Sequence, residues 1–95
     1  MITSFNCKET EKLFEGYVSR KVATSCARVA QRKLEMLNAA VRVEDLRLPP
    51  GNHLEALKGD RDGQHGIRTN GQWRICFVWD DKTHNASAVE IVDYH

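Results

Sequence analysis

A seven-residue run near the C-terminus constrains the fold more than any other feature of the chain. Its large apolar residues take every second position: Trp73, Ile75, Phe77 and Trp79. Because successive side chains of a β-strand point to opposite faces, the run predicts a strand with one apolar face. Asn70-Gly71 just before it indicates a tight turn from a preceding strand near His65–Asn70. A sheet containing this strand needs a layer of helices over its apolar face.

The first half of the chain supplies that layer. Ile2–Phe5 is short and β-prone and predicts a first strand. Asn6 followed by Glu9 resembles a capping box that opens a helix, and Gly16 suits the end of that helix.

A second, longer helix is predicted to begin between Ser19 and Thr24 and to last to about Ala40. Its apolar stripe has helical spacing: Val22, Cys26, Val29, Ala30, Leu34, Leu37 and Val41. The residues off the stripe are expected to face water: Arg28, Arg32, Lys33 and Glu35. Pro49-Pro50-Gly51-Asn52 ends this helical half, because proline disfavours a continuing helix.

The remaining segments complete an α+β fold. After Leu54–Lys58 come a polar turn at Gly59–Gly63, the strand near His65–Asn70, the strand Trp73–Trp79 and a last strand from about Ala88. We therefore predict a single domain, residues 1–95, of order β-α-α-β-β-β. Two N-terminal helices pack on one face of a small antiparallel sheet and leave the other face open.

Strand alternation predicts which side chains look out from the open face. If Trp73 and Ile75 face the helices, Arg74, Cys76 and Val78 face outward; similar reasoning turns Arg68, Glu90, Val92 and Tyr94 outward. Arg68, Arg74 and Tyr94 thus converge, with Lys58 and Arg61 at the rim. Guanidinium groups suit phosphate and an aromatic ring suits an unstacked base, so this face fits RNA. Alternatively, Arg74 is only solvated and Tyr94 only fills surface.

Length and charge limit the kind of site. A chain of 95 residues forms one small core without a deep cavity, so an active site must lie on an open face. The net charge of +1 weighs against a nucleic-acid binder that works by bulk charge, so basic side chains must cluster locally. Three widely spaced cysteines, no apolar leader and no long apolar segment indicate a cytoplasmic protein without a membrane contact.

The histidines do not predict a metal site, and no cofactor is expected. His53, His65, His84 and His95 lack the short paired spacing of zinc ligands, alone or with the cysteines. His95 is instead suited to proton transfer, as is Asp93 nearby. Strict alternation places both on the helix side of the sheet, so they join Arg74 only if the strand ends or bulges near residue 92.

Three segments in order resemble the HigB branch of the RelE-superfamily toxins. They are Leu54–Arg61 (LEALKGDR), Trp73–Phe77 (WRICF) and the terminal Ile91–His95 (IVDYH). The element order also resembles that family's fold, so the resemblance covers essentially the whole chain. It implies an endoribonuclease that cuts mRNA in the ribosomal A site. It also implies that a HigA-like helix-turn-helix antitoxin neutralises the toxin. The toxin would then contact operator DNA only through this antitoxin.

The resemblance also implies roles for individual residues. Arg74 would stabilise the phosphorane-like transition state and Lys58 would add a second positive charge. Tyr94 would stack the target base, while Asp93 and His95 would supply or relay protons. Arg61, Arg68 and His65 are the further RNA-binding candidates.

Two positions depart from the family pattern. Some relatives have histidine in place of Glu55 and arginine in place of Asn70, and His65 and Arg68 are the nearest substitutes. Which of Asp93, His95 and His65 acts as base stays open. No metal is needed in such a reaction, because RNA carries its own 2′-hydroxyl nucleophile.

Two other functions are compatible with this fold. A ParE-like toxin would inhibit DNA gyrase by binding, which leaves Arg74 and the terminal Asp93-Tyr94-His95 without a role. A non-catalytic remnant of a toxin would serve only as a co-repressor of its antitoxin.

Overall fold

A computed structural model describes residues 1–17, 22 and 24–93 of the chain. Two α-helices, α1 (Lys8–Phe14) and α2 (Thr24–Ala39), precede four strands. The strands are β1 (Glu55–Ala56), β2 (His65–Arg68), β3 (Trp73–Asp80) and β4 (Asn85–Asp93). Two short 3₁₀ turns, η1 (Val43–Arg47) and η2 (Pro50–Asn52), lie between α2 and β1, and a third, η3 (Gly59–Arg61), lies between β1 and β2. The predicted α+β architecture is confirmed.

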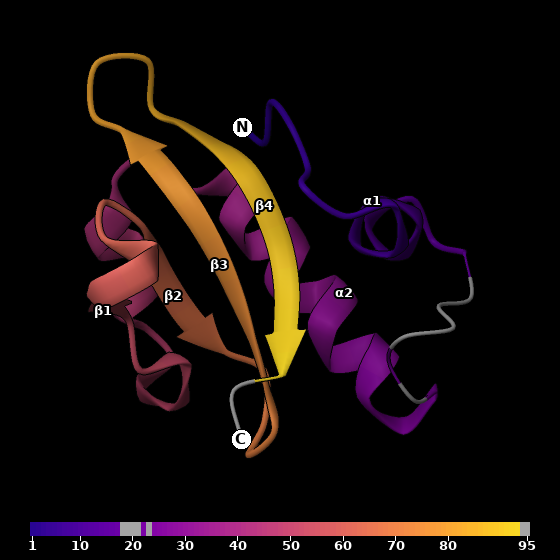
Figure 1. Ribbon diagram of the computed structural model, residues 1–95. Helices are drawn as coiled ribbons and strands as arrows, with labels where there is room; N and C mark the ends of the chain where they lie inside the picture. Colours follow the sequence, from indigo (N-terminus) through magenta and orange to yellow (C-terminus); the bar gives the residue numbers. More distant parts are fainter. Residues whose placement is uncertain (18–21, 23, 94–95) are drawn as a thin grey trace.

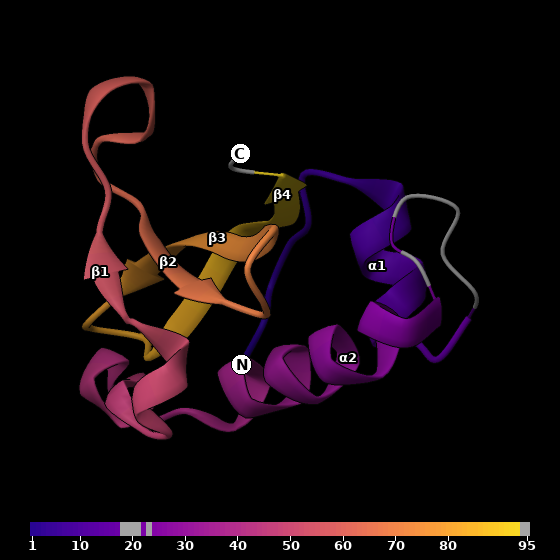
Figure 2. The same ribbon diagram turned by 90° about the horizontal axis from the view of Figure 1, so that it is seen from below.

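The four strands form an antiparallel meander of order β1-β2-β3-β4. α2 crosses behind the sheet, and α1 lies beside β4 (Figure 1). Seen from below, the loop that carries η3 projects from the side of the sheet opposite α2 (Figure 2). Among the described residues, no helix covers this second face, so the sheet has the open face that alternation predicts.

The alternation in β3 is confirmed by burial. Ile75 and Phe77 are fully buried against the helices, together with Ile67 of β2 and Val89 and Ile91 of β4. Leu34 and Leu37 of α2 close this core from the other side. Val41 is exposed instead of continuing the helical stripe, because α2 ends at Ala39 before the stripe reaches it.

The start of α1 differs from the prediction. Its N-cap is Cys7 and makes no side-chain capping hydrogen bond, so the capping box at Asn6 and Glu9 is wrong. The end is as expected, since Gly16 has φ of +96°, which glycine adopts without strain. Buried Thr10 joins α1 to the sheet, because its Oγ1 accepts from the Ile91 amide at 3.0 Å.

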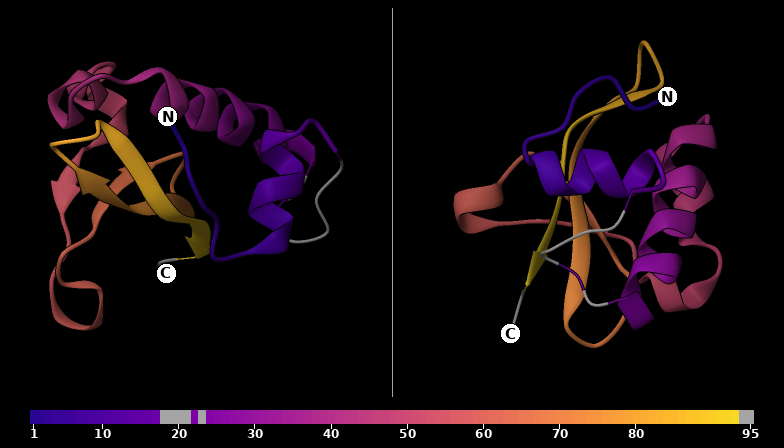
Figure 3. Two further views of the ribbon diagram at one scale, coloured as in Figure 1. Left: turned by 90° about the horizontal axis from the view of Figure 1, so that it is seen from above. Right: turned by 90° about the vertical axis from the view of Figure 1, so that its right-hand side faces the viewer.

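The N-terminal segment runs parallel to β4 without forming a strand. Ile2 and Phe5 make isolated bridges to Ala86 and Val89 of β4. Figure 3 shows this segment passing along β4 before it enters α1. A bulge at Ala88 falls between the two bridges, and the predicted strand Ile2–Phe5 is reduced to two isolated bridges with their backbone hydrogen bonds.

The prediction that Lys33 faces water is wrong. Its side chain is buried, and Nζ donates to Oδ1 of fully buried Asn52 in η2. The Asn52 amide nitrogen in turn donates to the carbonyls of Leu46 and Leu48 at 3.1 and 3.3 Å. A tertiary partner therefore brings this cation into the interior, where burial lowers the pKa of Lys33. None of the described helices is long and apolar enough to span a membrane.

Candidate active site on the open face of the sheet

Four residues of the open face lie in one row across the sheet. Glu55 of β1 pairs with Gly66 of β2, Gly66 with Cys76 of β3, and Cys76 with Glu90 of β4. Directly opposite residues of neighbouring strands point to the same face. The row therefore places a carboxylate at each side of the open face and a small residue at each of the two central positions.

Two arginines lie over this row, each paired with one of the carboxylates. Arg74 donates from Nη1 to Glu55 Oε1 at 3.2 Å. Arg61, which η3 contributes, donates from Nη1 to Glu90 Oε1 at 2.9 Å. The Arg74 side chain crosses Gly66, where an added Cβ would lie 3.5 Å from Arg74 Cδ. At that distance the Cβ would be in ordinary contact with Arg74, and its tightest neighbour would be Leu57 Cδ2 at 3.3 Å.

The two arginines and Glu55 line a shallow hollow of about 390 Å³. Its walls come from β1, the following loop and β3: Glu55, Ala56, Leu57, Lys58, Arg61 and Arg74. Lys58 is exposed and is the N-cap residue of η3, so the loop geometry sets its place relative to Arg61. The hollow combines three cations with one carboxylate on its wall, an arrangement suited to a phosphate diester.

A β-bulge determines which side chains of β4 reach this face. The register shifts between Cys76 and Val78, where β4 carries one residue more than β3. Ala88, at this point, has φ of +52°, a left-handed conformation that is uncommon outside glycine. The extra residue lets both Ala86 and Val89 face the helices, so that Ala86 packs inward while Glu90 still faces the open side.

Cys76 lies beneath the two guanidinium groups and is fully buried. Burial raises the pKa of its thiol, and the positive charges of Arg61 and Arg74 offset part of this effect. A buried thiol with a raised pKa is a poor nucleophile at neutral pH. The chemistry of the hollow therefore belongs to its charged side chains.

The structure brings three of the predicted site residues together, namely Arg74, Lys58 and Arg61. Arg68 shares their face, since it is exposed and directly opposite Arg74 in the register. Tyr94 and His95 lie outside the described residues.

His65 and Asp93 do not join this group. His65 pairs with Phe77, and its ring stacks on that of Phe77 on the helix side at a centroid distance of 6.0 Å. Asp93 is opposite Trp73 in the register, and its Oδ2 accepts from Gln72 Nε2 at 3.1 Å. The bulge in β4 is at Ala88 and not near residue 92, so β4 continues regularly to Asp93.

The predicted site lacked the two carboxylates. From the sequence, Glu55 is only a departure from the family pattern, and Glu90 faces outward without a predicted role. Alternation predicts the face of Glu90 but makes no prediction for Glu55. The contacts of both carboxylates depend on the β1–β2 pairing and on the path of the η3 loop between these strands. Asn70, the other departure, has a local structural role. Its Oδ1 accepts from the Gln72 and Trp73 amides at 2.9 Å each and closes the β2–β3 turn.

Comparisons with known proteins agree with this architecture. Residues 3–95 match the family model described as a RelE-like toxin of type II toxin-antitoxin system HigB. Toxin HigB-1 of Vibrio cholerae is 40% identical over 82 residues, which cover 85% of this chain and 86% of that protein. Endoribonuclease HigB of Proteus vulgaris is 30% identical over 95 residues, the full length of both chains.

A solved structure shows the same fold. The YoeB-YefM complex from Staphylococcus aureus contains a chain that superposes with a TM-score of 0.56 at 17% identity, covering 100% of this chain and 95% of that one. Because the family model also matches nearly all residues, the chain belongs to the HigB-like family of RelE-like toxins of type II toxin–antitoxin systems.

Proposed function

We propose that this toxin is an endoribonuclease whose active site is the hollow on the open face of the sheet. The convergence of Arg74, Lys58 and Arg61 on one hollow is the observation that carries the proposal. The Proteus vulgaris relative is named an endoribonuclease, which supports the same activity here. A phosphate diester that enters the hollow would meet guanidinium and ammonium donors from two separate elements.

The reaction is an attack of the RNA 2′-hydroxyl on the adjacent phosphorus, with departure of the 5′-oxygen of the next nucleotide. Arg74 and Lys58 stabilise the charge that develops on the phosphorane oxygens, the largest contribution that such a small site offers. The reaction needs no metal, because the nucleophile is part of the substrate. Among the described residues that line the hollow, Glu55 is the one carboxylate, so it is placed to accept the 2′-hydroxyl proton.

The open site and the family of the chain both point to partners, namely the ribosome and an antitoxin. A shallow hollow cannot align RNA by itself, so a ribosome that presents the mRNA in its A site would supply the positioning. The carboxylates that pair with Arg74 and Arg61 also reduce the attraction of this face for free RNA, which supports delivery of the mRNA by the ribosome. Tyr94 is proposed to stack the target base, and Asp93 and His95 are proposed to transfer protons. A HigA-like antitoxin would neutralise the toxin.

The test is mRNA integrity in a purified translation system with the wild-type toxin, with and without ribosomes. We expect cleavage only with ribosomes, products with 5′-hydroxyl ends, and no cleavage where the scissile nucleotide is 2′-deoxy. Uncut mRNA in the presence of a toxin that arrests growth would overturn the proposal and direct the work to a gyrase supercoiling assay.

A further inference from the structure

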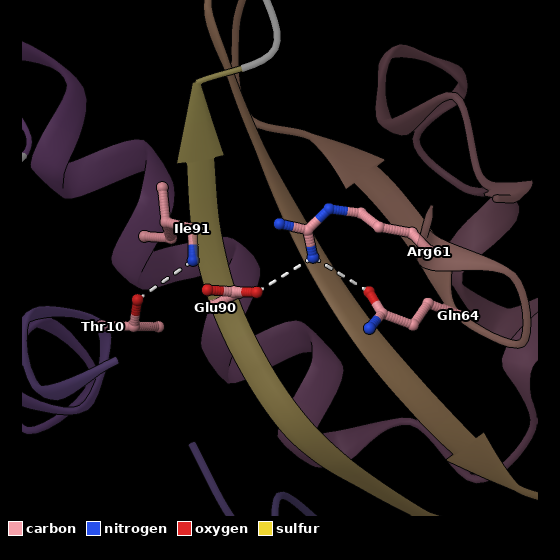
Figure 4. A network of polar contacts seen from close by, with 5 residues as sticks. All are labelled: Thr10, Arg61, Gln64, Glu90 and Ile91. Carbon is pink, nitrogen blue, oxygen red and sulfur yellow. Dashed lines mark hydrogen bonds and ion pairs between the residues drawn. The ribbon is translucent and has the colours of Figure 1, made fainter. Parts of the chain in front are cut away.

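The Arg61–Glu90 contact joins two segments far apart in the chain. Nη1 of Arg61 donates to Glu90 Oε1 at 2.9 Å and to Gln64 Oε1 at 3.1 Å (Figure 4). The two side chains are partly buried, with 31% of the Arg61 side chain and 21% of the Glu90 side chain exposed. The hydrogen bond to Glu90 raises the pKa of Arg61, whose guanidinium is in any case always charged in a protein. η3 is thus fastened to β4 across the open face.

Glu90 is itself held firmly. Its neighbour Ile91 donates its amide to Thr10 Oγ1 at 3.0 Å, which ties this part of β4 to α1 (Figure 4). Across the sheet, Glu90 pairs with Cys76 in the register of β3. Glu90 follows the bulge at Ala88 and lies in the regular part of β4, where it alternates with inward-facing Val89 and Ile91. Glu90 is therefore a fixed acceptor to which the more exposed loop is attached.

Arg61 also organises the loop around it. Its amide donates to the Lys58 carbonyl at 3.4 Å, and its own carbonyl accepts from the Gln64 amide at 3.0 Å. These bonds close the turn that begins at Lys58, a cation of the hollow. Fixing the Arg61 side chain consequently restrains the loop that carries Lys58 as well.

The contact leaves part of the guanidinium unused. Both side-chain hydrogen bonds of Arg61 start from Nη1; within the described part of the chain, Nη2 and Nε make none. Those two nitrogens form one edge of the planar fork, and such an edge binds two oxygens of a phosphate at once. Glu90 thus orients Arg61 without occupying the edge that a phosphate would bind.

We propose that Glu90 is a positioning residue that presents Arg61, and with it the Lys58 loop, to an RNA phosphate next to the scissile one. This inference rests on the nuclease function proposed above. Glu90 does not touch the RNA; it acts through Arg61. Without Glu90, Arg61 would keep only its side-chain bond to Gln64 of the same loop, so nothing on β4 would hold its side chain over the open face and the phosphate would lose a preorganised donor pair.

A double-mutant cycle tests this role on ribosome-bound mRNA with Glu90→Ala, Arg61→Ala and the double variant. We expect each single variant to lower kcat/KM by about tenfold, the loss of one charge-assisted contact. In the Arg61→Ala background, Glu90→Ala should cost nothing further. Glu90→Gln keeps an acceptor for Arg61 and should recover most of the loss. Thermal melting of each variant shows that it is folded.

The matched control is Glu9→Ala, which breaks an ion pair with Lys12 on α1 at 3.7 Å and should leave kcat/KM unchanged. Equal losses from Glu90→Ala in the wild-type and Arg61→Ala backgrounds would overturn the inference, as would no loss in the wild type. In both cases the nuclease function would stand. A wild-type toxin that leaves mRNA intact would overturn the function and the inference together.

Discussion

Arg74 and Glu55 are 19 residues apart in the chain, yet their side chains meet at 3.2 Å in the hollow on the open face. The pair places the main candidate for transition-state stabilisation next to a carboxylate. The charge of Arg74 is therefore partly balanced before RNA arrives, and a phosphate must share this guanidinium with Glu55. The same contact brings a proton acceptor close to the point where the phosphate would lie.

Glu55→Gln should separate these two effects. We expect single-turnover cleavage of ribosome-bound mRNA to fall by about 10²-fold or more, because a general base is lost. Binding of a 2′-O-methyl mRNA to the same complex should not weaken, because a negative charge beside Arg74 is removed. Glu35→Gln, an exposed position on α2, is the control. Wild-type cleavage by Glu55→Gln would exclude Glu55 as the base.

Asn52 should be among the most sensitive positions for stability. Asn52→Ala leaves the buried Lys33 ammonium and two carbonyls without their partner, and we expect a loss of about 3 kcal/mol in the free energy of unfolding. Urea denaturation measures this loss. Lys33→Met combined with Asn52→Ala should be less destabilising than Asn52→Ala alone. Additive losses would show that the two residues do not depend on each other.

Ala88 should respond to substitution according to its left-handed backbone. Ala88→Gly relieves the positive φ and should stabilise the fold by up to about 1 kcal/mol, whereas Ala88→Val should destabilise it by more than that. Thermal unfolding of the two variants provides the comparison. If the two substitutions shifted the midpoint equally, the bulge would have to be absent in solution.

Acid should weaken the fold partly through Asp45. The Arg42 and Val41 amides donate to its carboxylate at 3.0 Å each and lower its pKa below the ordinary value of 3.8. The two hydrogen bonds favour the charged form of the Asp45 carboxylate. Their contribution to the stability of the fold is therefore complete above pH 3.8 and is lost as the pH falls through the lower pKa of the folded state. Urea midpoints between about pH 2 and 6 should fall less steeply for Asp45→Asn than for the wild type. Identical slopes would contradict this assignment.

Periodic features of the sequence predicted the sheet well. The alternation of Trp73, Ile75 and Phe77 is a local property with a period of two, and it correctly separates the helix side from the open side. It also brings Arg74 to the open face, where the loop adds Lys58 and Arg61. In the same way, the stripe of α2 predicted Ala30, Leu34 and Leu37 as core.

Features that depend on tertiary partners could not be predicted from local patterns. Lys33 looks like a surface cation until η2 supplies Asn52, and the two are 19 residues apart. The Ala88 bulge has no glycine to mark it. His65 is predicted as a substitute for the histidine that some relatives have in place of Glu55, but its position two residues before inward-facing Ile67 places it on the helix side.

Single-turnover cleavage of ribosome-bound mRNA by Arg74→Ala, beside Arg28→Ala, tests most directly whether the open face is the active site. Arg28 is an equally charged, exposed residue on α2, across the sheet from the hollow. We predict that Arg74→Ala lowers the cleavage rate by about 10²–10³-fold, the effect of removing one donor to the developing charge. Arg28→Ala should cleave at the wild-type rate. Wild-type cleavage by Arg74→Ala, or an equal loss in both variants, would contradict this assignment.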